Sequence, residues 1–416
     1  MKTVKRLSSG SRTVILAGSA ALLAGGIASA SLSPALASSR TEGPVPSQTL
    51  WVSTHGTDVG NTCTNPANPC LTIAHAVAVA PSGATVKVEP GTYTNAASNG
   101  IDLFQPVTIE AVGNVAITGT GPIFNLYNAD NPTAGVTGVT IAGFHFENVT
   151  GSSYNGVITV PGYGAGNVTV RNNRFTNNTQ EAIGYHGNNG LAAPLGTGWK
   201  IVRNTILGVT QAGHSGIWLG GLSDSVISRN VVVDTQHAGI ILTANGATPP
   251  SNNNDKIVQN KVRDVPYEGI QIAYGDGILV RSNVITDAGT AGTLPANPSA
   301  SSTSAIMLFN AGQTNVMVIH NTASDSFNGF AVGQPPSSGS GTLGSGIVVT
   351  GNNFANETNA GIADYAPPGS APLNAMLNWW GCKAGPGTAG CSTVIGSVDY
   401  TPWLKHPANV QLASGL

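Results

Sequence analysis

Charged side chains are scarce in this 416-residue sequence: Asp, Glu, Lys and Arg make up 9% of it, against about 25% in an ordinary globular chain. With 17 Lys and Arg against 19 Asp and Glu, the net charge is −2. That balance gives no electrostatic reason to expect a nucleic acid or an anionic membrane as partner. Aromatic residues are also few, at 6%, so the core has to be built from Val, Ile, Leu and Ala.

Long apolar runs are absent after the N-terminal region, so no later segment is predicted to span a membrane. The one such run, TVILAGSAALLAGGIASA, follows several Lys and Arg residues and precedes the small-residue site Ala35-Leu36-Ala37. This order predicts a secretory signal peptide over residues 1–37, a linker over 38–50 and an extracellular protein. A retained membrane anchor is the alternative, although Gly and Ser interrupt the run.

Cysteine is limited to four residues, arranged as two local pairs in loops. Cys63 and Cys70 lie in NTCTNPANPC, and Cys382 and Cys391 lie in GCKAGPGTAGC. The local spacing predicts two disulfides, Cys63–Cys70 and Cys382–Cys391, which fit an oxidising compartment. The alternative is a four-cysteine metal site, which would require the two ends of the domain to meet.

The residues that are abundant form a repeat. An Asn recurs every 23 to 38 residues, with an apolar residue three positions before it in every copy. The aligned residues are Asn173, Asn204, Asn230, Asn260, Asn283, Asn321 and Asn352. A weaker copy has Phe144 in place of the Asn. Each copy also carries a second short strand that begins with Gly or Ala, such as Gly239-Ile240-Ile241.

A unit of this kind cannot bury its apolar face alone, but units stacked ~4.8 Å apart give each backbone group a partner in the next turn. We therefore predict an all-β fold, a single parallel β-helix of about ten coils with three short sheets. Asn suits the corners because it tolerates the left-handed conformation, and identical Asn residues can form a ladder along the stack. Regular alternation argues against disorder, and the lack of hairpin turns argues against a propeller.

Caps are predicted at both ends, because an open β-helix end is an unpaired sheet edge. The domain is predicted over residues 51–405, with an N-terminal cap and first strand at 51–95 and regular repeats at 139–365. Residues 71–80 have helical spacing, and 376–405 form the C-terminal cap before a tail at 406–416. Three of the six Trp residues lie in this last segment, where they cap the final coil or, in the alternative, stack on sugars.

The chain resembles the secreted right-handed parallel β-helix proteins of the pectin-lyase-like superfamily. The resemblance covers roughly residues 50 to 405 and lies in LWVSTHGTD, CLTIAHAV and GATVKVEPGTYT, in the Asn-cornered coils, and in NWWG and GSVDYTPWL. It implies a right-handed solenoid, and many members cleave, epimerise or bind polysaccharides. The catalytic sets of the lyases and polygalacturonases are not found here, so no catalytic residue carries over.

Candidate chemistry is predicted at the corner before each Gly-Ile strand. Stacking places His214 one coil from His237, and His237 near Tyr267 and Glu268, a set that could supply a general base and acid. Trp218 and Gln271 are predicted to point outward on the following strand, as a sugar platform and a hydroxyl partner. Longer loops at 209–213 and 288–304 would wall a groove beside them. The alternative is that these polar residues decorate a solvated corner.

Two further columns carry charge. Arg203 and Arg229 each precede a corner Asn and could neutralise a uronate, or else pair with Asp or face solvent. Four positions after the Asn lie Asp234, Asp264 and Asp287, whose spacing allows a calcium site. In the alternative, each Asp only caps its own turn.

These observations predict a monomeric extracellular protein that binds a polysaccharide and cleaves it as a lyase or hydrolase, with calcium as the one candidate cofactor. No nucleic-acid or membrane partner is expected. The alternative is a non-catalytic binding or structural module of the cell surface.

Overall fold

The computed structural model describes residues 47–95, 100–127, 135–151, 156–160, 164–185, 196–243, 252–291, 303–309, 313–333, 344–366 and 370–410. The predicted signal peptide and most of the loop at 288–304 therefore lie outside the described residues. Residues Ser47–Leu416 cluster as one compact unit, separate from Met1–Pro46. None of the described helices is long and apolar enough to cross a membrane.

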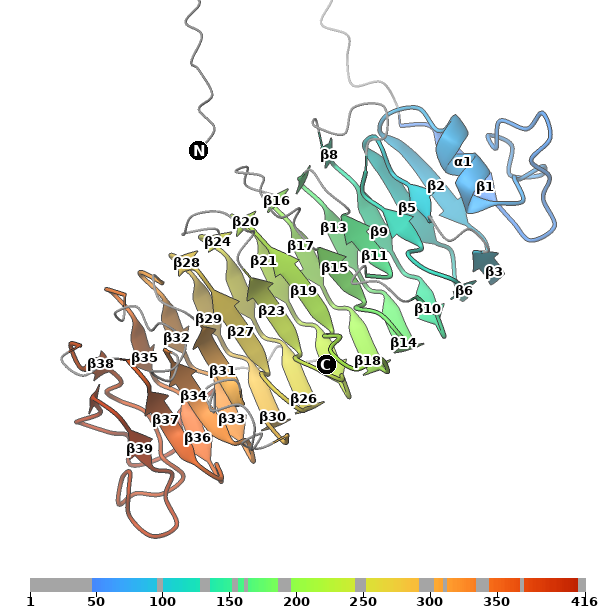
Figure 1. Cartoon of the computed structure of the whole chain (residues 1–416). Helices are drawn as coiled ribbons and strands as arrows, with labels where there is room; N and C mark the ends of the chain where they lie inside the picture. The colour runs from blue at the N-terminus through green and yellow to red at the C-terminus, as the bar shows by residue number, and fades with distance from the viewer. Residues whose placement is uncertain are drawn as a thin grey trace, which may run out of the picture. The chain divides into compact units, whose positions relative to one another are not determined.

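Three parallel sheets run along the axis of this unit, and each coil over residues 84–364 contributes one strand to each sheet (Figure 1). Sheet A comprises β1 (Thr49–Val52), β2 (Ala84–Val88), β5 (Val107–Ala111), β9 (Thr140–Ala142), β13 (Thr169–Arg171), β17 (Lys200–Val202), β21 (Val226–Ser228), β25 (Lys256–Val258), β29 (Leu279–Arg281), β32 (Met317–Ile319), β35 (Val348–Thr350), β38 (Leu373–Asn374) and β40 (Val398–Asp399).

Sheets B and C have the same stacked order. Sheet B comprises β3 (Gly91–Asn95), β6 (Val115–Gly119), β10 (His145–Glu147), β14 (Arg174–Asn178), β18 (Thr205–Val209), β22 (Val231–Val233), β26 (Lys261–Val265), β30 (Val284–Ala288), β33 (Thr322–Ser324) and β36 (Asn353–Ala355). Sheet C comprises β4 (Ile101–Asp102), β7 (Phe124–Asn125), β11 (Ile158–Val160), β15 (Ile183–Tyr185), β19 (Ile217–Gly220), β23 (Ile240–Thr243), β27 (Ile270–Ala273), β31 (Ser304–Phe309), β34 (Asn328–Val332), β37 (Ala360–Asp364) and β39 (Val394–Ile395).

Two-residue strands add a small fourth face between sheets C and A, which the sequence did not predict. They are β8 (Val136–Thr137) paired with β12 (Ala165–Gly166), and β16 (Gly196–Thr197), β20 (Leu222–Ser223), β24 (Asn252–Asn253) and β28 (Gly275–Asp276) in one sheet. Strands this short give too little alternation to be recognised in a sequence.

The core consists of columns of apolar side chains, one per sheet. In sheet B, Phe146 pairs in register with Phe175, and their rings stack with centroids 4.8 Å apart. In sheet C, Ile217, Ile240 and Ile270 follow one another in register and are fully buried. Each such side chain contributes about 1.5–3 kcal/mol through burial, and the total is repeated along the stack.

The Asn ladder is confirmed. Asn230 Oδ1 accepts hydrogen bonds from the backbone N–H and from Nδ2 of Asn204, at 2.9 and 3.0 Å. Its own Nδ2 donates to the carbonyl oxygen of Ile201 and to Oδ1 of Asn260. The ladder runs from Asn173 to Asn378, one coil beyond the predicted series, and all of its members are buried.

The left-handed conformation lies one residue before the position predicted. The residue preceding the ladder Asn has the positive φ, for example 57° at both Arg203 and Arg229 and 59° at Gln259. The prediction that Asn itself takes this conformation is wrong, because the Asn side chain has to point inward to reach its neighbours. The preceding side chain consequently points outward.

Glycine before the sheet C strands is explained by close packing of the coils. A Cβ atom on Gly239 would lie 2.6 Å from the carbonyl oxygen of Gly269 and 2.4 Å from a methyl group of Val262. Gly216 is equally confined. Any larger residue would push successive coils apart at the beginning of the strand that carries the candidate site.

Both ends are capped as predicted, and both disulfides are present. Helix α1 (Ile73–Val79) begins after the N-cap residue Thr72, and it covers the first coil beside the Cys63–Cys70 disulfide (Figure 1). At the other end, Trp380 is fully buried against Phe354, which supports capping rather than sugar stacking for this Trp. Cys382–Cys391 closes the loop that follows, so the four-cysteine metal alternative is wrong.

Candidate functional site

The corner between sheets B and C brings the predicted histidines together. Strand pairing aligns Ile183 with Ile217, Ile217 with Ile240, and Ile240 with Ile270. The residues at equal offsets before these positions therefore lie in adjacent coils. This register confirms that His214 is one coil from His237, and that His237 is one coil from Tyr267.

A buried hydrogen-bonded pair, Glu181 and His214, lies at the centre of this corner. His214 Nδ1 is 2.8 Å from Glu181 Oε2, and both side chains are buried. The other oxygen of Glu181 accepts no hydrogen bond from the described residues. The sequence did not indicate Glu181 as a site residue, because the two side chains meet diagonally across coils rather than at equal offsets.

His237 is the next histidine along the axis, and it is partly exposed. Its Nδ1 is 3.1 Å from Ser215 Oγ, which also accepts a hydrogen bond from the backbone N–H of Ala238. Burial lowers the pKa of His237, and the nearby His214 lowers it further, while Glu181 acts in the opposite direction. The net shift favours a neutral imidazole, the form that can accept a proton.

Three aromatic rings from successive coils form a row along the axis. The rings of Trp218 and His237 stack with centroids 5.9 Å apart, and those of His237 and Tyr267 lie 4.9 Å apart. All three residues are partly exposed. A row of partly exposed rings is a surface that can stack against the apolar face of a sugar.

Glu268 lies under this row rather than in it. Its side chain is 2% exposed, and Oε2 has no hydrogen-bond partner among the described residues. Burial raises the pKa of Glu268 to about 8, so the carboxyl group is mostly protonated at neutral pH. Gln271 is partly exposed on β27, two coils from Trp218, with Ile241 between them in register.

Comparison with known proteins agrees with this architecture. Residues 111–285 match the family model of the right-handed β-helix region. A solved rhamnogalacturonan lyase is similar over 80% of this chain and 87% of its own, at 14% identity and a TM-score of 0.56. A double mutant of the tailspike protein of E. coli bacteriophage HK620, in complex with a pentasaccharide, is similar over 71% of this chain and 55% of its own, at 15% identity and a TM-score of 0.52. No protein with a curated description matches significantly.

The chain has the right-handed parallel β-helix fold. Identities of 14–15% establish the shared fold alone. The chemistry of this β-helix has to be argued from its own residues.

Arg203 and Arg229 are not part of the B–C corner of the β-helix. They lie at the corner between sheets A and B, on the outside of the Asn ladder. Arg229 Nε donates a hydrogen bond to Gln259 Oε1 at 3.0 Å. The two arginines therefore lie at a different corner from His237, and their predicted binding of a uronate stays a prediction.

The Asp column lies at exposed turns between sheets B and C. Asp234 directly follows β22, whereas Asp264 and Asp287 are the next-to-last residues of β26 and β30, and all three have left-handed φ values of 52–58°. Asp264 forms a salt bridge with the adjacent Arg263 at 2.7 Å. This geometry fits the alternative in which each Asp stabilises its own turn, and calcium binding by the column stays a prediction.

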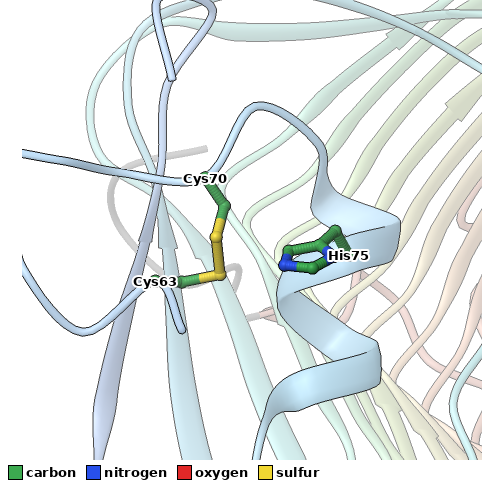
Figure 2. A group of neighbouring side chains, drawn as sticks. All are labelled: Cys63, Cys70 and His75. Carbon is green, nitrogen blue, oxygen red and sulfur yellow. A yellow bond between two sulfur atoms is a disulfide. The ribbon is translucent and has the colours of Figure 1, made fainter. Parts of the chain in front are cut away.

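A group of potential metal ligands occurs instead at the N-terminal cap. Atoms of Cys63, Cys70 and His75 lie within 4.8 Å of one another (Figure 2). Figure 2 shows that the two sulfur atoms are joined as a disulfide. They are therefore not thiolates, and His75 Nε2 already contacts the carbonyl oxygen of Asn61 at 2.8 Å. The group is structural.

Of the two predicted loops, the structure describes mainly the first. Thr210, Ala212 and Gly213 are exposed between β18 and β19. A cavity of about 400 Å³ lies far from this corner, between α1 and the first coils, and is lined by Leu71, Tyr93 and Ile123 among others. The ring row thus lies on the surface of the sheet rather than in this cavity.

Proposed function

We propose that this β-helix binds an extracellular polysaccharide along the Trp218–His237–Tyr267 row and cleaves it by elimination. The row itself carries the proposal, because three partly exposed rings from successive coils lie beside a buried cluster of titratable groups. The two disulfides suit an oxidising, extracellular compartment. The similarity to a rhamnogalacturonan lyase and to a glycan-bound tailspike agrees with this class of ligand.

Exposure separates the roles of the side chains. His237 and Tyr267 are partly exposed and can reach a bound sugar, whereas His214, Glu181 and Glu268 are buried. We assign the Glu181–His214 pair to positioning and tuning His237. Glu268 supplies a neutral carboxyl group beneath Tyr267, in line with its raised pKa.

Elimination fits these groups better than hydrolysis does. A glycosidase needs two carboxyl groups about 5–9 Å apart around one bond. Glu181 and Glu268 are three coils apart, ~14 Å by the coil spacing, and both are buried. In elimination, neutral His237 takes the proton at C5 of a uronate. The electron pair forms the C4–C5 double bond, the C4–O bond breaks, and the leaving oxygen takes a proton from the Tyr267 hydroxyl.

The test is a panel of rhamnogalacturonan, polygalacturonate, alginate, xylan and neutral glucans. Binding is measured by titration, and elimination by the ultraviolet absorbance of unsaturated uronate ends. We expect His237→Ala to slow the formation of unsaturated product at least about 100-fold with little change in affinity for the polysaccharide, as removal of a general base does. Trp218→Ala should weaken binding about tenfold, because it removes the platform.

Trp51→Ala is the matched control, since Trp51 lies on sheet A and contacts Lys87 instead. Binding without any released product would support the alternative, a non-catalytic binding module. Absence of binding across the panel, or equal losses in Trp218→Ala and Trp51→Ala, would refute the proposal.

A further inference from the structure

The outside of the corner between sheets A and B carries Lys or Arg in five successive coils. The segments are residues 169–174, 200–205, 226–231, 256–261 and 279–284, and their strands are paired in register. Together they contain no Asp or Glu. We call their cations the basic edge: Arg171, Arg174, Lys200, Arg203, Arg229, Lys256, Lys261 and Arg281.

Lys and Arg residues are concentrated in this part of a chain that has few charged residues. The basic edge holds eight of its 17 Lys and Arg residues within four coil spacings, ~19 Å along the axis. Asp224 lies before sheet A, and Asp264 lies near the far end of β26 in sheet B. Asp255 precedes Lys256, but its side chain is buried and does not lie on the outer surface. The outer surface of the five segments is therefore positive, although the charges of the whole chain nearly cancel.

Lys261 has a partner of its own. The other seven cations of the basic edge form no salt bridge with a carboxylate of the described residues, where Lys87–Glu110 and Arg263–Asp264 are pairs of this kind. Arg229 instead donates a hydrogen bond to the neutral side-chain amide of Gln259. Arg203 and Arg229 occupy the same offset in adjacent coils, ~4.8 Å apart by the coil spacing, so their positive charges repel each other. A bound anion would relieve that repulsion.

A groove of about 380 Å³ lies within the edge, where β25 and β29 pair. Lys256 and Arg281 stand at its opposite corners, because Lys256 aligns with Leu279 and Val258 aligns with Arg281. Val258 and Leu279 thus give the groove an aliphatic floor, and Gln259 and Ser282 border it. A sugar ring bearing a carboxylate matches this combination, with its C–H face on the floor and its charge beside a cation.

We propose that the basic edge is a second glycan-binding surface, which holds an acidic polysaccharide along the axis, away from the Trp218–His237–Tyr267 row. Its five coils would contact successive charged groups of one extended polymer. The five segments contain no Phe, Tyr or Trp, the residues on which single-stranded nucleic acids stack. The proposal goes beyond the function proposed above and holds whether or not elimination occurs at His237.

The test compares polygalacturonate with its fully methyl-esterified form, which keeps the backbone and loses the charge. The variant is Arg203→Asn/Arg229→Asn/Lys256→Gln/Arg281→Gln in the full chain, with Asn chosen because Arg203 and Arg229 have left-handed backbones. The matched control, Lys87→Gln/Arg263→Gln/Lys383→Gln/Lys405→Gln, removes the same charge elsewhere. Both sets are also made in the Trp218→Ala background, which removes the other surface.

We expect the edge variant to lose at least tenfold in affinity for polygalacturonate at low salt, with a shallower dependence of affinity on salt. The control variant should stay within about twofold of wild type, and the esterified polymer should bind poorly to both. The unfolding midpoint of the edge variant should equal that of wild type or exceed it, because like charges have been removed.

Three outcomes would overturn the proposal. Equal losses in the edge and control variants would mean that only net charge matters. Equal binding of the esterified polymer would mean that the carboxylates are not recognised. Tighter binding of duplex DNA or of anionic vesicles than of any acidic polysaccharide would assign the edge to another partner. If the basic edge proves not to bind an acidic polysaccharide, the effects of Trp218→Ala and His237→Ala on the other surface can still be measured. The two proposals can therefore be tested separately.

Discussion

At the corner between sheets A and B, each coil from Asn173 to Asn378 places the same side chain inside the turn, whereas the corner between sheets B and C changes from coil to coil. The first corner satisfies every inward group with its neighbour in the next coil. The second buries Glu181, His214 and Glu268, and two of their oxygens have no partner among the described residues. Identical neighbours satisfy one another's hydrogen bonds, while unlike neighbours leave buried polar atoms without a partner among the described residues.

The two corners also differ in their outward side chains. At the A–B corner the Asn residues hold the turn, and the preceding residue differs from coil to coil, as Asn, Arg, Gln, Ser, His, Gly or Leu. At the B–C corner the outward row of rings is packed on buried groups, because Ser215 contacts His237 and Tyr267 precedes the buried Glu268. Substitutions of outward side chains should therefore affect stability less at the first corner than at the second.

The largest effect is expected at the buried Glu181–His214 pair. His214→Ala would remove the hydrogen-bond partner of the buried Glu181 Oε2, and loss of one member of a buried pair typically lowers the free energy of unfolding by about 3–5 kcal/mol. The double variant Glu181→Gln/His214→Ala should lose less, since the carboxyl group is removed as well. Urea unfolding followed by circular dichroism measures both. Equal losses in the single and double variants would show that packing, and not the unsatisfied carboxyl group, determines the effect.

A smaller loss is expected in the Asn ladder. Asn230→Ala would leave the backbone N–H of Asn204 and the carbonyl oxygen of Ile201 without these partners in a buried corner. Each unsatisfied group costs about 1–3 kcal/mol, and relaxation makes the sum smaller, so we expect a loss of about 2–4 kcal/mol in urea unfolding. Asn172→Gly, at an exposed left-handed position, is the control and should change stability by less than about 0.5 kcal/mol. A similar loss of unfolding free energy in both variants would show that the hydrogen bonds of the ladder do not stabilise the fold.

The ladder and the coil spacing were predictable because they repeat. An apolar residue three positions before each Asn recurs in every copy, so the register of His214 against His237 followed from alignment alone. The left-handed residue was not predictable, since most positions preceding the ladder Asn hold residues such as Arg203, Gln259 and His320, which do not favour that conformation. Stacking of the ladder overrides the local preference.

Contacts between residues at unequal offsets in adjacent coils could not be predicted from the sequence either. The Glu181–His214 pair joins unequal offsets, and columns read at equal offsets cannot reveal it. The basic edge was missed for a different reason: net charge sums over the whole chain, whereas binding depends on which charges share an edge. A charge of −2 for the whole chain is compatible with a strongly positive corner.

The smallest effect is expected at the surface salt bridge, which sharpens the contrast with the buried pair. Arg263 and Asp264 approach within 2.7 Å, but their side chains are 56% and 44% exposed. Solvent screening limits such pairs to less than about 1 kcal/mol, so Asp264→Asn should shift the unfolding midpoint only slightly in calcium-free buffer.

The same measurement tests calcium binding by Asp234, Asp264 and Asp287. A midpoint that rises with calcium in wild type and not in Asp264→Asn would establish a metal site there. Identical midpoints with calcium and with chelator would leave the column as a series of turn residues.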